Sequence, residues 1–128
     1  MKYATKNWID TANYDIKTAV AETRQTIKSI IRKYICNLES LGISIQKVIV
    51  FGSYAKGTFT KDSDIDIAVI SNEFEKMRLW DKAKYLGRAA RGIPYPIEAI
   101  GVSPSEFEKS RQGTLIDEVK RNGIEIQI

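Results

Sequence analysis

Apolar residues recur at helical spacing through the first third of the chain. Between residues 4 and 41 there is neither glycine nor proline, and apolar side chains follow one another three or four positions apart. This pattern predicts a helical segment that ends at Gly42, with a kink near residues 11–18, where weaker helix formers gather. We therefore expect residues 1–41 to form a helical arm and residues 42–128 to form the main domain. The apolar positions of the arm are Trp8, Ala12, Ile16, Ala19, Ile27, Ile30 or Ile31, Tyr34, Leu38 and Leu41.

After Gly42 the pattern changes to short apolar runs separated by turn residues. β-Branched and apolar segments at 43–51, 65–70 and 97–102 predict three strands, and the alternation at 124–128 predicts an edge strand. Three or four strands among helices define an α+β (mixed α/β) fold, in which a small mixed sheet is flanked by helices.

Three helices are predicted between these strands. The segment 73–91 has helical periodicity, Pro104 suits the first turn of a short helix, and 114–121 precedes the stop at Asn122-Gly123. In the first of these helices we expect six apolar residues to face the core, namely Phe74, Met77, Trp80, Ala83, Leu86 and Ala90.

Composition restricts the chemistry more than the fold. With 128 residues, of which 43% are hydrophobic and 28% charged, the chain suits one globular domain. The lone Cys36 cannot form an internal disulfide, and the absence of histidine excludes histidine-ligated zinc and every imidazole base. No apolar run approaches the length of a membrane span, so we expect a cytoplasmic protein without a membrane partner. The net charge of +4 is too modest to indicate nucleic acid as the partner.

Two aspartates one residue apart begin the second predicted strand. Because successive side chains of a strand alternate between faces, Asp64 and Asp66 point the same way while Ile65 and Ile67 point into the core. Two carboxylates aimed at one place repel each other unless a cation compensates, and oxygen ligands of this kind suit Mg²⁺ bound to substrate phosphates. The spacing therefore predicts a site for a Mg²⁺-nucleotide.

Gly52-Ser53 closes the preceding strand and is the candidate phosphate-binding turn. Backbone N–H groups beside a glycine can approach a phosphate closely, and the Ser53 hydroxyl adds a donor. Lys56 and Lys61 lie on the same connection, where they either screen a triphosphate or are solvated loop lysines. With Gly52 and Ser53 we group Lys56 and Ser63 as nucleotide-binding residues.

Glu98 is the candidate third acid. It is the only carboxylate on the third predicted strand, on the face opposite Ile97 and Ala99, and a lone carboxylate among apolar residues is costly unless it meets a metal or a donor. Its role would be to bind the second ion of a two-metal site and to help take the proton from the attacking hydroxyl. A surface edge strand would also tolerate a glutamate here.

Gly52-Ser53, ten residues, then Asp64-Ile65-Asp66 resembles the signature of the DNA polymerase beta nucleotidyltransferase superfamily, and the small size resembles its minimal nucleotidyltransferase (MNT) branch. The resemblance covers about Ile43 to Ile128. It implies a nucleotidyltransferase fold, with Gly52 and Ser53 on the triphosphate of an NTP, ATP by preference, and with Asp64 and Asp66 on Mg²⁺. Glu98 stands where most members carry aspartate, a difference that bears on its proton-accepting role more than on metal binding.

The function implied is transfer of a nucleoside monophosphate, AMP by preference, from an NTP to a hydroxyl acceptor with release of pyrophosphate. Trp8-Ile9-x-x-Ala12-x-x-Asp15-Ile16-x-x-Ala19 is similar to the opening helix of HEPN proteins, which are commonly encoded beside MNT proteins as toxin to antitoxin. If the chain resembles the MNT branch in function as well, the acceptor is a tyrosine of a HEPN toxin. We expect the N-terminal helices to bind a second copy or a HEPN-type partner. The alternative is a non-catalytic antitoxin that neutralises its partner by direct contact.

Overall fold

The structure, a computed structural model, describes residues 14–128, with the backbone alone described for residues 14–22. In chain order its elements are α2 (Tyr14–Ser40), β1 (Lys47–Phe51), α3 (Ser53–Lys56), β2 (Ile65–Ile70), the 3-10 helix η1 (Asn72–Phe74), α4 (Leu79–Ala89), β3 (Ile97–Val102), α5 (Pro104–Glu108), α6 (Leu115–Asn122) and β4 (Ile124–Ile126).

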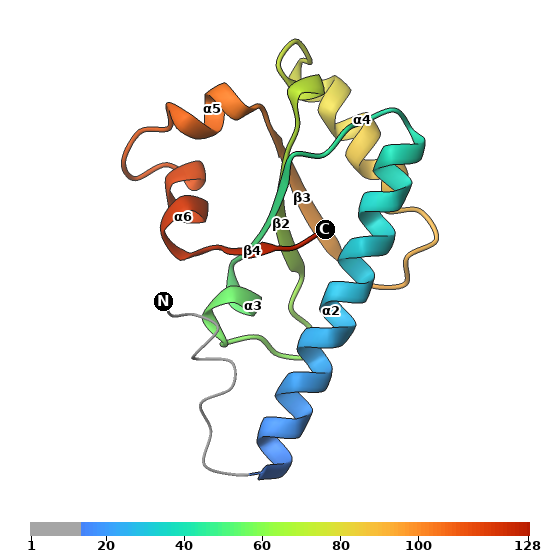
Figure 1. Cartoon of the computed structure of the whole chain (residues 1–128), viewed down its shortest axis with the longest axis vertical. Helices are drawn as coiled ribbons and strands as arrows, with labels where there is room; N and C mark the ends of the chain where they lie inside the picture. The colour runs from blue at the N-terminus through green and yellow to red at the C-terminus, as the bar shows by residue number, and fades with distance from the viewer. Residues whose placement is uncertain (1–13) are drawn as a thin grey trace.

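The strands form one mixed sheet in the order β3-β2-β1-β4. β1 pairs antiparallel with β2 and with β4, whereas β2 and β3 run parallel. A parallel pair needs a long crossover, which η1 and α4 supply. Figure 1 shows α2 and α4 together on one side of the sheet and α5 and α6 on the other. The predicted α+β fold with a small mixed sheet is confirmed, and the predicted strands 65–70 and 97–102 coincide with β2 and β3.

One face of the sheet is sealed by α4 and the second half of α2. Ile31 and Leu38 of α2 are completely buried in the main core. The Tyr34 hydroxyl donates a hydrogen bond to the Leu86 carbonyl at 2.7 Å, which ties α2 to α4. From Ile27 onward, α2 is thus part of the domain core. A separate arm, which we predicted for residues 1–41, stays a prediction for the residues before Ile27.

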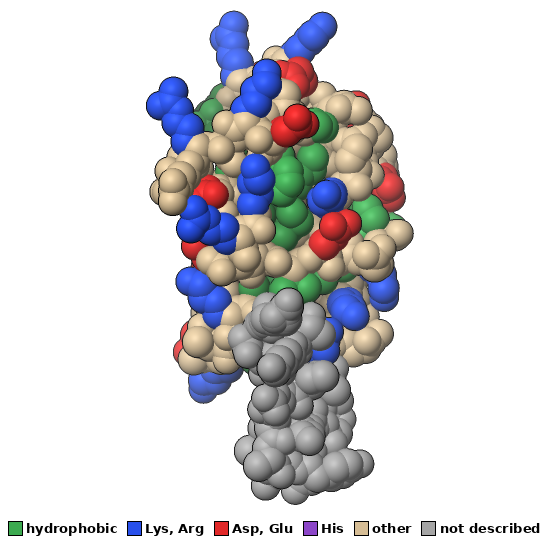
Figure 2. All heavy atoms as spheres, turned by 60° about the vertical axis from the view of Figure 1, so that its left-hand side comes forward, with side chains coloured by type: hydrophobic (Ala, Val, Ile, Leu, Met, Phe, Trp, Pro, Cys, Tyr) green, Lys and Arg blue, Asp and Glu red, His purple; other side chains and the backbone are tan. Residues whose placement is uncertain are grey.

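The opposite face carries a smaller apolar cluster under α5 and α6. Between these helices and the strands lies a hollow of about 310 Å³, with Ile49 and Phe107 in its lining. The ammonium groups of Lys47 and Lys120 lie 5.7 and 5.5 Å from the centre of the Phe107 ring. Figure 2 views this side and shows apolar side chains reaching the surface between basic and acidic ones.

The predicted helix over 73–91 is wrong in its start and in two of its core residues. Its first turn is the separate helix η1, capped by the Ser71 hydroxyl, which accepts a hydrogen bond from the Glu73 N–H at 3.2 Å. Because the helix is interrupted between η1 and α4, the helical periodicity that buries Phe74 does not continue to Trp80. Trp80 is 81% exposed, and Ala83 is exposed beside it. Met77, Leu86 and Ala90 do contact the core, as predicted.

The first predicted strand is shorter than expected. Ile43 is buried, but β1 begins only at Lys47. The backbone N–H of Ser44 donates to Glu73 Oε1 at 2.6 Å, and this side-chain partner takes the place of a strand neighbour. The predicted edge strand at 124–128 is shorter too, since β4 covers Ile124–Ile126.

The N-terminal helix is continuous where it is described. α2 runs from Tyr14 to Ser40, and Gly42 follows it with a φ of 94°, as the predicted stop requires. The described part of the predicted kink, residues 14–18, lies within this helix. The rest of the kink, together with Trp8 and Ala12 of the HEPN-like pattern, lies outside the described residues. Among the helices described, none is long and apolar enough to cross a membrane.

Candidate active site

Three strand ends bring two of the predicted acids side by side. In the sheet register Asp66 of β2 stands between Phe51 of β1 and Glu98 of β3. Paired residues of adjacent strands point to the same face, so both carboxylates lie on the face that α5 and α6 cover farther along the strands. Ile65 and Ile67 are buried on the opposite face, as predicted.

Gly52 is needed for the approach of Asp66. Its φ is 71°, in the region that favours glycine, and a Cβ built on it would collide with the Asp66 carboxylate. The turn after β1 and the carboxylate of β2 are therefore in direct contact. The sequence suggested a phosphate-binding reason for this glycine, and the structure adds a steric one.

The electrostatics of Asp66 show that the three acids act on one another. Burial raises the pKa of Asp66, and the nearby charges of Glu98 and Asp64 raise it further. Asp66 is half-buried, whereas Asp64 and Glu98 are exposed. A positive charge at this place would relieve the repulsion and lower the pKa of Asp66.

The chemistry of this donor set fits a hard divalent cation. Carboxylate oxygens are the ligands that Mg²⁺ takes in proteins, commonly one or two carboxylates together with substrate phosphates. Within the described part of the chain, however, no three or more His, Cys, Asp or Glu side chains converge tightly enough to hold a metal ion. Asp64, Asp66 and Glu98 are thus near enough to influence one another without forming a closed cage, so phosphate oxygens would have to complete the coordination.

Ser53 and Lys56 lie on the short helix that follows Gly52. Ser53 begins α3, and Lys56 ends it. The Lys56 ammonium lies 3.5 Å from Glu118 Oε2 on α6, so its charge is already engaged with a carboxylate that the sequence did not single out. The structure therefore joins α3 to α6 through this ion pair.

Ser63 faces the other side of the sheet from the acids. Its hydroxyl accepts a hydrogen bond from the Thr60 N–H at 2.8 Å and so shapes the loop before β2. It also lines a cavity of about 410 Å³ on the α2 side, together with Lys61, Tyr54 and Tyr95. The structure thus brings Asp64, Asp66, Glu98 and Gly52 together and gives Lys56 and Ser63 other neighbours.

Two features of the site escaped the sequence reasoning. Tyr54 stacks on Phe59 with ring centres 4.6 Å apart, which fixes the loop between α3 and β2. Two aromatic residues on either side of Gly57 are the signal that could have suggested this contact. Glu118 carries no such signal, because only the packing of α6 brings it to Lys56.

The sheet, the turn after β1 and the acids at the start of β2 define the class of protein. Residues 28–126 match the family model of the nucleotidyltransferase domain, and the chain belongs to this family. It is a nucleotidyltransferase, an enzyme that transfers a nucleoside monophosphate from an NTP, and the predicted membership is confirmed.

Two relatives come from Methanocaldococcus jannaschii. The chain is 32% identical over 83 residues, 64% of this chain and 79% of the relative, to the "Putative protein adenylyltransferase MJ0141". A second match, to the "Putative protein adenylyltransferase MJ0604", is 54% identical over 28 residues, which are 22% of this chain and 28% of that protein. These matches do not show the HEPN-like resemblance of residues 8–19.

A solved structure supports the fold. The crystal structure of a "putative nucleotidyltransferase" from Sulfolobus solfataricus superposes with a TM-score of 0.60. The match covers 82% of this chain and 83% of that one at 20% sequence identity, so it speaks for the fold alone.

Proposed function

We propose that this nucleotidyltransferase transfers AMP from Mg²⁺-ATP to a hydroxyl group of a protein. The observation that carries the proposal is the contact of Gly52 with Asp66, beside two further carboxylates that raise the Asp66 pKa. Placing two carboxylates beside a half-buried aspartate lowers the stability of the fold, and a bound cation would offset this cost.

Each residue has a role in this proposal. Asp64 and Asp66 would hold Mg²⁺, which when bound supplies charge neutralisation at the reacting phosphate. Glu98 would contribute to a second metal position and accept the proton of the acceptor hydroxyl. Gly52 and Ser53 would bind the triphosphate. Lys56 and Ser63 would assist only if Lys56 leaves Glu118 and the Thr60–Ser63 loop shifts.

The reaction is a substitution at the α-phosphorus of ATP. The acceptor oxygen forms a bond to this phosphorus, the bond to the bridging oxygen of the β-phosphate breaks, and pyrophosphate leaves with that electron pair. The proton of the hydroxyl passes to Glu98 or to solvent. Positioning and charge compensation would provide most of the rate, because no residue needs to form a covalent intermediate.

A protein acceptor is favoured by the relatives, both of which are named for protein adenylylation. The finer proposal, a tyrosine on a HEPN-type toxin, rests on the resemblance of Gly52-Ser53 and Asp64-Ile65-Asp66 to the MNT branch, and the absence of histidine prevents the chain from being such a nuclease itself. Under this proposal the protein is an antitoxin that acts by adenylylation, and its N-terminal helices contact the toxin or a second copy.

Transfer of label from ATP tests the proposal. The full chain is incubated with α-labelled ATP, with and without Mg²⁺, and with the protein encoded beside it. Asp64→Asn and Asp66→Asn are expected to lose at least about 100-fold in rate, because each removes a carboxylate that the ion needs. Asp62→Asn is the matched control, since Asp62 is an exposed aspartate in the loop just before the strand.

The chemical form of the product sharpens the result. Mass spectrometry of the labelled partner should find one nucleoside monophosphate on a tyrosine. Equal labelling by Asp66→Asn and the wild type would contradict the assignment of the site. Neutralisation of the partner by both aspartate variants, without any labelling, would instead favour the non-catalytic binding alternative.

A further inference from the structure

The exposed face of α4 is the feature of the surface that the nucleotide chemistry does not explain. Trp80 is 81% exposed and Leu79 is 83% exposed, the two largest values among the exposed large hydrophobic residues described. Single exposed apolar residues are ordinary, but two adjacent large ones at the start of a helix form a patch that favours contact with another molecule.

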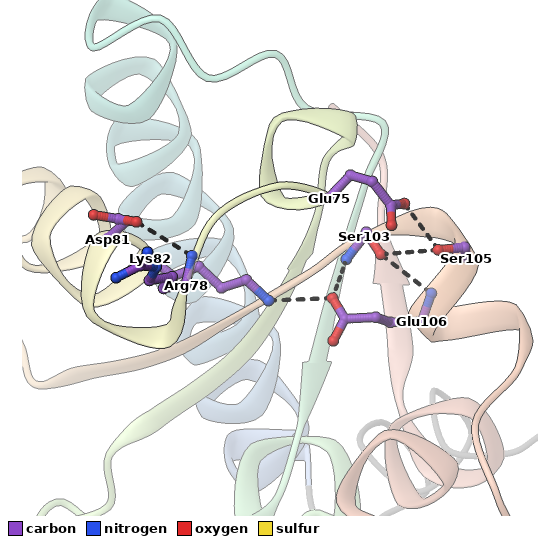
Figure 3. A network of polar contacts seen from close by, with 7 residues as sticks. All are labelled: Glu75, Arg78, Asp81, Lys82, Ser103, Ser105 and Glu106. Carbon is purple, nitrogen blue, oxygen red and sulfur yellow. Dashed lines mark hydrogen bonds and ion pairs between the residues drawn. The ribbon is translucent and has the colours of Figure 1, made fainter.

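This exposure belongs to a helix that is firmly anchored. Figure 3 shows the polar network that joins the start of α4 to α5. The Lys82 ammonium lies 3.1 Å from Glu106 Oε1, and the same oxygen accepts a hydrogen bond from the Ser103 N–H at 3.0 Å. The Asp81 carboxylate accepts from the Arg78 N–H at 3.2 Å. Lys82 and Trp80 lie on opposite sides of the helix, so the network fixes α4 while leaving Trp80 outward.

The outward face of α4 continues from Trp80 in one stripe. Residues at helical spacing along it, and in the turn that follows, are all exposed: Trp80, Ala83, Lys84, Gly87, Arg88 and Arg91. Within the described residues, none of the three basic side chains pairs with a carboxylate. The stripe is therefore apolar at its start and positively charged toward its end.

Two hollows follow the same stripe and lead to the edge strand β3. The first, of about 400 Å³, is lined by Trp80, Ala83 and Lys84. The second, of about 290 Å³, lies between α4 and the edge strand β3, and its lining includes Ala83, Gly87 and Ala99. Because the hollows share Ala83, they run together from the exposed tryptophan to the edge strand β3.

Gly87 gives an independent sign of a partner. A glycine inside a helix costs stability relative to alanine, and here nothing lies within 4 Å of the position that a Cβ would take. No packing within the described chain requires this glycine. With Ala83 one turn earlier, it leaves a flat strip on which the backbone of another helix could lie closely.

We propose that this α4 groove, formed by Trp80, Ala83, Lys84, Gly87, Arg88 and Arg91, binds an acidic amphipathic helix of the protein acceptor. Apolar side chains of that helix cover Leu79 and Trp80, and its carboxylates meet the basic residues. The inference rests on the proposed function for the role of the bound protein as acceptor, since α4 packs against β3, the strand that carries Glu98. A protein helix accounts for the exposed leucine and the small residues, whereas a nucleic acid would use only the charges and the tryptophan.

A designed probe tests the groove without knowledge of the natural acceptor. The probe is a fluorescein-labelled helical peptide with leucine on one face and glutamate elsewhere, titrated into the full chain and followed by anisotropy. A peptide with lysine in place of glutamate and an RNA hairpin are titrated in parallel. We expect the acidic peptide alone to bind, more weakly at high salt.

Variants locate the binding. Trp80→Ala and the double variant Lys84→Glu/Arg88→Glu should each weaken acidic-peptide binding by about tenfold or more. The matched controls are Leu115→Ala, an exposed leucine that begins α6, and the double variant Lys109→Glu/Arg111→Glu, none of which should change it. Gly87→Ala should raise the melting temperature by a few degrees and weaken binding of the acidic peptide. A glycine with a purely structural role would not produce these two opposite effects.

The outcomes separate this proposal from the nucleotide site. Trp80→Ala should keep the melting shift with Mg²⁺-ATP, and Asp66→Asn should keep peptide binding, so either proposal can fail alone. No binding of the acidic peptide, or equal binding by the Trp80→Ala variant, would overturn the groove. Tighter binding of RNA that depends on Trp80, or dimerisation that Trp80→Ala abolishes, would assign it to RNA or to a second copy instead.

Discussion

The two faces of the sheet are built from alternate residues of the same strands, yet they are covered differently. The face under α2 and α4 carries the main core, with Ile65, Ile67 and Val69 of β2 almost fully buried. The face under α5 and α6 buries Ala68 and Ile70 but carries Asp66 at the start of the strand. One strand thus supplies a rigid support on one side and a polar site on the other.

The difference shows how a small domain places charges that it cannot bury. Because side chains alternate along a strand, a slip of one residue would turn Asp66 into the main core and Ile65 out of it. The apolar packing behind β2 therefore fixes the direction of the carboxylates. The site needs no large structure in front of it, and this suits a protein that must admit both a nucleotide and an acceptor.

The largest effect expected from this comparison is on stability. Ile31→Ala, which empties a fully buried position in the main core, should cost about 2–5 kcal/mol of unfolding free energy. Ile116→Ala on α6 removes the same atoms from a half-buried position and should cost about 1 kcal/mol. Urea denaturation measures both variants. Similar losses would show that the two faces contribute equally to the core.

The contact between Gly52 and Asp66 comes next. Gly52→Ala should cost about 2–3 kcal/mol and abolish nucleotidyl transfer, because the new methyl group displaces the Asp66 carboxylate. Gly42→Ala is the matched control, since Gly42 also has a positive φ but has open space around it. It should cost about 1 kcal/mol and leave transfer unchanged. If both variants behave alike, backbone strain alone explains Gly52.

A smaller effect is expected at the link between α2 and α4. Tyr34→Phe removes the hydrogen bond from the tyrosine hydroxyl to the buried Leu86 carbonyl and should cost about 1 kcal/mol. Tyr85→Phe, on α4, serves as the control, and chemical denaturation compares them. If Tyr34→Phe left the free energy of unfolding unchanged, the two helices would be held by apolar packing alone.

The smallest effect is the pH dependence that Asp66 contributes. Its pKa is raised in the folded state, first by burial and then by Glu98 and Asp64, so the unfolded chain loses this proton at lower pH than the folded one. Between the ordinary aspartate pKa and the raised value the folded state binds more protons, and stability falls as pH rises. Asp66→Asn should lack this decrease, which denaturation from pH 4 to pH 7 measures. If the stability of the wild type and of Asp66→Asn changed with pH in parallel, the prediction would be wrong.

Much of the fold follows from local pattern. Strands β2 and β3 coincide with their apolar runs, Pro104 begins α5, and Thr114 caps α6 by accepting a hydrogen bond from the Asp117 N–H at 3.2 Å. The helix around Trp80 could not be predicted in the same way. Its apolar residues continue the spacing of Phe74, and only the interruption between η1 and α4 turns Trp80 outward.

The candidate site divides along the same line. The spacing of Asp64 and Asp66 predicted that both carboxylates point to one side, because alternation is a property of any strand. Pairing across the sheet decided that Glu98 stands beside Asp66 and that Gly52 must lack a side chain, since these contacts join residues far apart in the chain. Likewise, packing of α6 gave Lys56 its partner Glu118. Local order therefore came from the sequence alone, and the neighbours of each charge came from the tertiary structure, which alone sets long-range distances.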